Sequence, residues 1–242
     1  MLKLLRGEIY RLHRKKSLYI YFGALAVVYL AIAFIRSGGF TQGSIANDAL
    51  SYFVLLPALV GGFLFTAIYT DDLGSKNLIA LVGSGTQKAT IVIAKFLLML
   101  AFCTVFFAVV PLYHVALYAL FGQQATTSIL VTLYAAALKY LLVTLAFAAL
   151  SGIVVYGLQR VTFALVTYLL LAFGVVNGLF SMALKAFAPS LAEHLVTGVS
   201  DRIMLALVGG GPVLLPILEL CAYIVAALVA SLVVFSRKEM EF

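Results

Sequence analysis

Six long apolar segments follow one another along the chain, and short polar stretches separate them. Each is close to the ~20 residues that a helix needs to cross about 30 Å of hydrocarbon, which predicts an all-α integral membrane protein with six transmembrane helices. We find no internal repeat and no Pro/Ser-rich or acidic linker, so residues 1–242 form one transmembrane domain. The expected spans are 18–35, 52–70, 90–118, 131–157, 162–184 and 213–235.

Residues 1–16 precede the first apolar segment and have a helical pattern of their own. Leu2, Leu5 and Ile9 recur at the spacing of one helix face, with lysines and arginines between them. A basic amphipathic helix binds at a membrane surface, where its cations reach lipid phosphates. We therefore expect residues 1–16 to form an interfacial helix on the inner leaflet. The run that follows is long enough to cross the bilayer, which favours a first span over a secretory signal.

Composition agrees with this pattern, because 64% of the residues are hydrophobic, 10% are charged and the mean hydropathy is +1.16. A soluble domain has roughly half apolar and about a quarter charged residues. The net charge of +7 could indicate nucleic-acid binding, but the basic residues gather at the ends of the apolar segments. Twelve of the sixteen lysines and arginines fall at the N-terminus, in alternate connections and in the tail. The positive-inside rule therefore predicts cytoplasmic N- and C-termini and no nucleic-acid partner.

Two connections are longer than a turn. The charge bias places residues 71–89 in the cytoplasm, where Asp72 can cap a short helix that stops at Gly83-Ser84-Gly85. Residues 186–212 fall on the external side and mix charged with apolar residues before a glycine run and Pro212. We expect this second connection to form a re-entrant helical hairpin that dips into the outer leaflet.

The patterns of nucleotide-binding, metal-binding and catalytic sites are absent from the sequence. It contains no G-x-x-x-x-G-K-[ST], H-E-x-x-H or C-x-x-C, so we expect no ATP site and no metal site. Val82-Gly83-Ser84-Gly85 is similar to the G-x-S-G of intramembrane serine proteases, but its first glycine is missing and the histidines fall on the opposite side. A flexible helix stop explains this stretch. Both cysteines lie within apolar segments, where a small buried hydrophobic residue is the ordinary explanation.

Four residues within the spans need an explanation. Lys139 and Glu219 are charged, and charged residues inside a membrane face a partner or water. The alternatives are separate contacts with the external interface, a direct Lys139–Glu219 ion pair that closes an exit gate, or contact with substrate. Gly174 and Gly178 form a G-x-x-x-G pattern. They either pack closely against another helix, in this chain or in a second subunit, or are tolerated without such a contact.

The loop after the second span has the most specific pattern. It reads Asp71-Asp72-Leu73-Gly74-Ser75-Lys76-Asn77-Leu78, followed by Gly85-Thr86-Gln87-Lys88 and then Ile91-Val92-Ile93-Ala94-Lys95. This order of acidic residues, glycine, leucine and later lysines resembles ABC-2 type transporter permeases. The resemblance covers nearly the whole chain: the basic N-terminal helix, the six spans, the long external segment before the last span and the Phe235-Ser236-Arg237-Lys238 tail.

The resemblance implies a half-transporter in the bacterial cytoplasmic membrane, in which two permease subunits, identical or homologous, bind two separate ABC ATPase subunits. ATP and magnesium would be bound by the ATPase, so this chain would hold no cofactor and catalyse no reaction. The compact size is similar to exporter permeases for antimicrobial peptides, including those for bacteriocin immunity, and drugs or lipids are the other cargoes. The loop would be the coupling helix that docks onto the ATPase, with candidate docking residues Asp71, Asp72, Leu73, Gly74, Lys76, Asn77, Leu78 and Leu81.

A self-contained secondary transporter or channel is the competing interpretation. Such proteins usually show repeated halves, broken helices or several intramembrane carboxylates, whereas only Lys139 and Glu219 are charged within these spans. An intramembrane enzyme is a third interpretation, which the lack of placed catalytic groups disfavours. Nothing in the residues selects the cargo.

Overall fold

The computed structural model of the protein describes residues 1–36, 42–75, 77–120 and 126–238. The chain is 90% helical, and these ranges contain no strand, which confirms the predicted all-helical class. The helices are α1 (Leu2–His13), α2 (Lys16–Arg36), α3 (Gln42–Leu56), α4 (Gly62–Phe65), α5 (Asp71–Gly74), α6 (Asn77–Gly83), α7 (Lys88–Leu120), α8 (Thr127–Leu158), α9 (Val161–Ala172), α10 (Val175–Phe187), α11 (Pro189–Ala192), α12 (Val196–Gly209) and α13 (Leu214–Arg237), with π-helical turns at Pro57–Gly61 and Thr66–Thr70.

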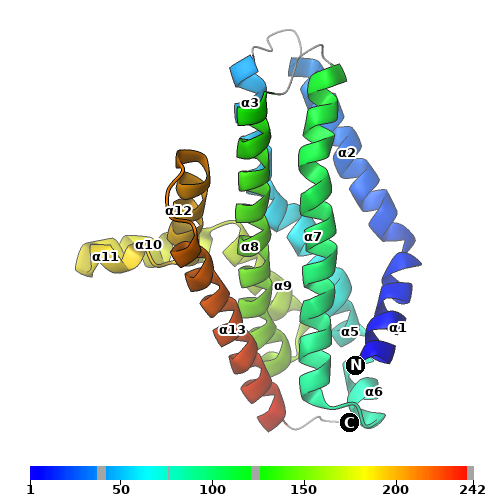
Figure 1. The fold of residues 1–242 in the computed structure, drawn as a ribbon. Helices are drawn as coiled ribbons and strands as arrows, with labels where there is room; N and C mark the ends of the chain where they lie inside the picture. Colours follow the sequence, from blue (N-terminus) through cyan, green and yellow to red (C-terminus); the bar gives the residue numbers. More distant parts are fainter. Residues whose placement is uncertain (37–41, 76, 121–125, 239–242) are drawn as a thin grey trace.

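Four helical stretches are long and apolar enough to cross a membrane: Ala49–Gly74, Lys88–Leu117, Thr127–Leu158 and Leu214–Arg237. Two bent pairs pass the same test if each is counted as one span. These are Leu2–His13 with Lys16–Ile32, bent by 58°, and Val161–Ala172 with Val175–Phe187, bent by 57°. The described residues therefore contain four to six candidate spans. The exact count of six and the cytoplasmic side of the termini stay predictions, although α1 and the end of α13 do lie at the same end of the bundle (Figure 1).

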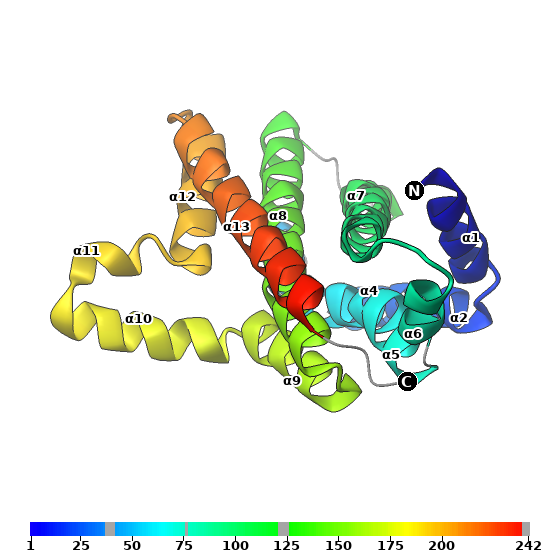
Figure 2. The ribbon, with the colours of Figure 1, turned by 90° about the horizontal axis from the view of Figure 1, so that it is seen from below.

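α8 is the central helix of the bundle. α3, α7, α9, α12 and α13 all contact it, and Figure 1 shows α7 running beside it while α13 crosses it. Glycine allows α8 and α13 to approach closely, because a Cβ at Gly157 would lie 3.1 Å from Val234 Cγ1 and one at Gly152 would lie 3.4 Å from Ser231 Oγ. α10 and α11 extend to one side of the bundle in both views (Figures 1 and 2).

The second span is widened at its middle by the two π-helical turns. Proline has no N–H to donate, so the regular hydrogen-bond ladder is interrupted at Pro57. Tyrosines of neighbouring helices bond to carbonyl groups of the first turn: Tyr168 Oη donates to Pro57 O at 2.8 Å, and Tyr21 Oη donates to Leu59 O at 2.9 Å. Gly61 leaves room for this contact, since a Cβ there would lie 2.0 Å from Tyr168 Oη. The widened turns are therefore held by side-chain donors, as backbone within hydrocarbon requires.

The predicted fifth span, 162–184, is not one straight helix. Gly174, with a φ of 74°, adopts the left-handed conformation and separates α9 from α10. α9 has 12 residues and is roughly 18 Å long, shorter than a hydrocarbon core of about 30 Å. A Cβ at Gly174 or Gly178 would meet no atom within 4 Å. Within the described residues the G-x-x-x-G pattern therefore makes a helix break and no close contact, and a contact with a second subunit stays a prediction.

The N-terminal helix and the connection at residues 186–212 both pack against the bundle. α1 is amphipathic, but it does not rest on lipid alone, because Glu8 and Leu12 are buried and α1 contacts α7. Residues 186–212 are largely helical and form α11 and α12, and α12 packs against α8 and α13. How deeply this segment enters the membrane stays a prediction.

Candidate functional site

Four ionisable side chains meet in a buried cluster between α1 and the bundle. We call Glu8, Arg11, Asp72 and Lys95 the inner ion network, after the predicted cytoplasmic side. Arg11 lies 2.5 Å from Asp72 Oδ1 and 2.7 Å from Glu8 Oε2, and Lys95 Nζ lies 3.1 Å from Glu8 Oε2. Lys95 also pairs with Asp72, and both of these side chains are 2% exposed. Two cations and two carboxylates balance one another, as charges removed from water must.

The inner ion network joins three parts of the chain. Glu8 and Arg11 belong to α1, Asp72 to the end of the second span, and Lys95 to α7. An ion pair between Lys15 and Asp71, both partly exposed, adds a second link beside it. The sequence offered one signal for the network, because a lysine inside the apolar run of α7 needs a partner. The sequence analysis uses Lys95 in the charge count and in the motif of the resemblance, and it assigns this lysine no partner.

Asp72 does not cap a helix, so that prediction was wrong. α5 continues the second span without a side-chain cap, and the carboxylate of Asp72 turns to Arg11 and Lys95. The Asp72 side chain is 2% exposed and is paired with both Arg11 and Lys95, so it is not available to a docking surface. Its role in the structure is to fix the end of the second span to α1 and α7.

α6 occupies the place of the predicted coupling helix, at the same end of the bundle as α1 (Figures 1 and 2). It stops where the sequence predicts. Gly85 adopts a φ of 82°, and Thr86 N donates to Leu81 O at 3.1 Å to close the last turn. Leu78 is only 5% exposed and packs in the hydrophobic core, with Leu81 partly buried against it.

This burial changes the candidate docking set. Leu78 is enclosed by its own chain, so its side chain is not exposed for docking as the resemblance implied. Of the remaining candidates, Leu73 and Leu81 are partly buried against the core, while Gly74 and Asn77 are exposed. Ala80, which the sequence did not single out, is also exposed. Lys76 lies outside the described residues.

A second set of charges lies on α8, α12 and α13 and in the turn before α12. We call Lys139, His194, Asp201, Arg202 and Glu219 the outer ion cluster, after the predicted external side. Lys139 Nζ lies 2.6 Å from Asp201 Oδ1, and Arg202 Nη2 lies 2.6 Å from Glu219 Oε2. His194 Nδ1 lies 2.5 Å from Glu219 Oε1. Lys139 and Glu219 therefore have different partners, and the direct pair weighed from the sequence is not formed.

The outer ion cluster fixes α12 to two spans at once. Consecutive residues of a helix point in different directions, so Asp201 can reach α8 while Arg202 reaches α13. The sequence analysis missed both residues because it placed them in the external connection at residues 186–212, outside the spans. The pattern that could have found them is an Asp-Arg pair within an apolar stretch, where each charge needs its own partner.

The outer ion cluster lies about one bilayer thickness from the basic residues at the other ends of α8 and α13. Lys139 is twenty-one residues from Arg160, and Glu219 is eighteen residues from Arg237. At ~1.5 Å per residue these stretches are roughly 32 and 27 Å long, close to the ~30 Å hydrocarbon core. The bundle thus has an apolar middle with the outer ion cluster at one boundary and α6 beyond the other.

The described residues were also compared with the pattern of a metal site. Within the described ranges, no group of three or more His, Cys, Asp or Glu residues could hold a metal ion. The features that remain for a functional interpretation are the apolar bundle, the two ion clusters and α6. Comparison with known proteins finds no matching family model, no similar curated protein and no similar solved structure.

Proposed function

We propose that this chain is the transmembrane permease subunit of an ATP-driven ABC exporter in the bacterial cytoplasmic membrane. It would work with separate ATPase subunits and with a second permease, identical or homologous, and move amphipathic peptides, drugs or lipids. The observation that carries the proposal is the way in which α6 is anchored to the bundle. This short helix lies outside the spans, and the inner ion network fixes the chain on both sides of it.

These contacts would allow α6 to transmit a movement of a bound partner to the spans. α6 follows Asp72 by a few residues and precedes Lys95, and these two side chains pair with each other. Leu78 anchors α6 itself in the core. Packed elements move as units rather than deforming continuously. A displacement of α6 would therefore shift the second span, α7 and α1 together, which is the action required of a coupling helix.

The exposed side of α6 is the surface proposed to receive the ATPase. It carries Asn77 and Ala80, with Gly74 before the helix and Ser84 after it. These side chains are small or polar, so a partner could approach the backbone closely. The permease needs such a partner because its sequence has no nucleotide-binding loop.

Co-purification tests this proposal. The tagged chain is expressed together with the proteins encoded beside it, and we expect an ABC ATPase to be recovered in an equal amount. Ala80→Arg places a long cation on the exposed side of α6 and should detach the ATPase without unfolding the permease. Ser128→Arg, at an exposed site at the start of α8, is the matched control and should retain it. Recovery of the ATPase with both Ala80→Arg and Asn77→Arg would show that docking occurs elsewhere.

A further inference from the structure

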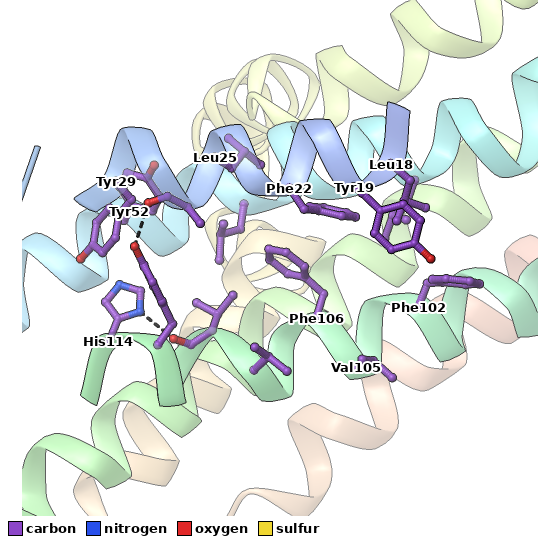
Figure 3. Close-up of a pocket in the computed structure, with 16 residues that line it drawn as sticks. Leu18, Tyr19, Phe22, Leu25, Tyr29, Tyr52, Phe102, Val105, Phe106 and His114 are labelled. Atoms are coloured by element: carbon purple, nitrogen blue, oxygen red, sulfur yellow. Dashed lines mark hydrogen bonds between the residues drawn. The ribbon is translucent and has the colours of Figure 1, made fainter. Parts of the chain in front are cut away.

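An elongated groove of about 450 Å³ runs between α2 and α7, with α3 and α4 behind it. Figure 3 shows Phe22 and Phe106 near its middle and Tyr29, Tyr52 and His114 at one end. Ligand pockets in proteins occupy roughly 300–1,000 Å³, and an apolar cavity of ~150 Å³ already holds benzene. The groove therefore has room for a ligand about three times the size of benzene.

Aromatic side chains bridge α2 to α7 across the groove. The rings of Phe22 and Phe106 are 4.8 Å apart, and those of Tyr29 and His114 are 4.7 Å apart. Tyr113 Oη donates to the backbone oxygen of Ala26 at 2.7 Å. These contacts join the two helices through side chains, and the space beside them stays open.

The groove matches one leaflet of a bilayer in length. On α2 its lining runs from Leu18 to Tyr29, eleven residues further on, which is roughly 16 Å of helix. One leaflet contributes about 15 Å, half of the ~30 Å hydrocarbon core. None of the residues that line the groove is Asp, Glu, Lys or Arg. A charged ligand would therefore lose its hydration in the groove without gaining an ion pair.

The Tyr29 end of the groove lies at the level of the outer ion cluster. Phe53 stacks between the ring of His114, at 5.3 Å, and the ring of Tyr140, at 6.4 Å. Tyr140 adjoins Lys139, a member of that cluster. The groove therefore begins at the boundary of the hydrocarbon and extends inward through a single leaflet.

His114 presents an unused acceptor at this end. Its Nδ1 lies 2.8 Å from Val110 O, and a carbonyl oxygen only accepts, so Nδ1 carries the proton. Nε2 of the neutral ring is then an acceptor, and it has no partner among the described residues although His114 is 2% exposed. A buried acceptor left unpaired costs free energy that a donor from a ligand would recover.

We propose that the groove binds one acyl chain of a membrane lipid from the leaflet at the outer ion cluster, with a hydroxyl or amide of that lipid donating to His114 Nε2. The length of the groove fits one chain, its uncharged lining fits hydrocarbon, and the single unused acceptor lies where the polar part of the lipid would be. The proposal concerns binding by this chain and does not depend on the transport function.

Photolabelling tests the acyl-chain site. The purified protein is placed in phosphatidylcholine nanodiscs with a trace of monoacylglycerol that carries a diazirine in its chain, and the labelled residues are mapped by mass spectrometry. We expect the label to concentrate on Phe106 and Val110 rather than on Val27, which is exposed outside the groove. Ala26→Trp fills the groove and should reduce labelling to the level of Val27. Ala24→Trp, on the exposed face of α2, should leave it unchanged.

A matched probe tests the hydrogen bond to His114. The dimethyl ether of the same monoacylglycerol has no donor and should label the groove about 2- to 12-fold less, the range expected for one neutral hydrogen bond. His114→Phe should abolish this preference, whereas His114→Gln, which keeps an acceptor, should retain part of it. Even labelling of groove and lipid-facing residues, or labelling that Ala26→Trp leaves intact, would overturn the acyl-chain site. An equal preference in wild type and His114→Phe would overturn the role of His114.

Discussion

Replacing Lys95 tests whether the inner ion network stabilises the bundle. Lys95→Met would leave Arg11 facing two carboxylates, Glu8 and Asp72. Asp72→Asn would leave Arg11 and Lys95 facing Glu8 alone. The double variant keeps the Arg11–Glu8 pair, which is balanced. We therefore expect each single change to be more damaging than both together.

The expected size of the effect follows from burial. Lys95 and Asp72 are both 2% exposed, and removing one member of a buried pair costs about 3–5 kcal/mol. In a protein of this length, 1 kcal/mol shifts the melting temperature by roughly 2–4 °C. Each single variant should therefore melt roughly 6–20 °C below wild type, and the double variant should recover part of that loss.

The chain contains its own reporter for this measurement. Cys103 is fully buried and Cys221 is exposed, and these are the two cysteines of the sequence. In a Cys221→Ala background, a thiol-reactive dye should gain fluorescence only when unfolding exposes Cys103. The melting temperature in detergent can then be compared among the variants.

A neighbouring pair provides the matched control. Lys15 and Asp71 link the same parts of the chain but are 34% and 37% exposed, and pairs in contact with water contribute about 0–1 kcal/mol. Lys15→Met and Asp71→Asn should therefore change the melting temperature little. The reasoning is refuted if Lys95→Met is no more damaging than Lys15→Met, or if the effects of Lys95→Met and Asp72→Asn simply add.

Two further predictions concern the bundle. Gly61→Ala should lower the melting temperature by an amount equivalent to about 1–3 kcal/mol, because the new methyl group would lie 2.0 Å from Tyr168 Oη. Gly23→Ala is the control and should not lower the melting temperature, because no atom lies within 4 Å of its Cβ. Equal effects of the two changes would contradict the packing at Gly61. The double variant Lys139→Glu with Glu219→Lys should be less stable than either single variant, because the lysine introduced at position 219 would face Arg202 and His194. A double variant that is more stable than the single variants would instead indicate a direct contact between positions 139 and 219.

Hydropathy and charge sufficed to predict the helical membrane class. The long spans α7, α8 and α13 follow the apolar runs closely because a helix in hydrocarbon needs little beyond length and apolar side chains. The break at Gly174 escaped this reasoning, since glycine is common in straight membrane helices as well. Only the positive φ of Gly174 in the structure distinguishes a glycine that breaks the helix from one that lies in a straight helix.

The partners of the charged residues could not be predicted from the chain alone. Lys139 and Glu219 lie at similar depths, which made them plausible partners, but depth does not say which faces of the helices meet. The packing of α12 against α8 and α13 decides the outcome, because it brings Asp201 and Arg202 between them. The close approach of α8 to α13 likewise uses Gly157, which belongs to no G-x-x-x-G pattern.

Reconstituted transport tests the central claim most directly. Proteoliposomes are prepared with the permease alone, with the neighbouring ATPase alone, and with both, and the movement of a fluorescent amphipathic peptide is followed after ATP is added on the side of α6. The account predicts movement only when both proteins and hydrolysable ATP are present, with loss of movement in the Ala80→Arg variant. Movement by the permease alone, driven by an ion gradient and indifferent to ATP, would contradict it and identify a self-contained secondary transporter.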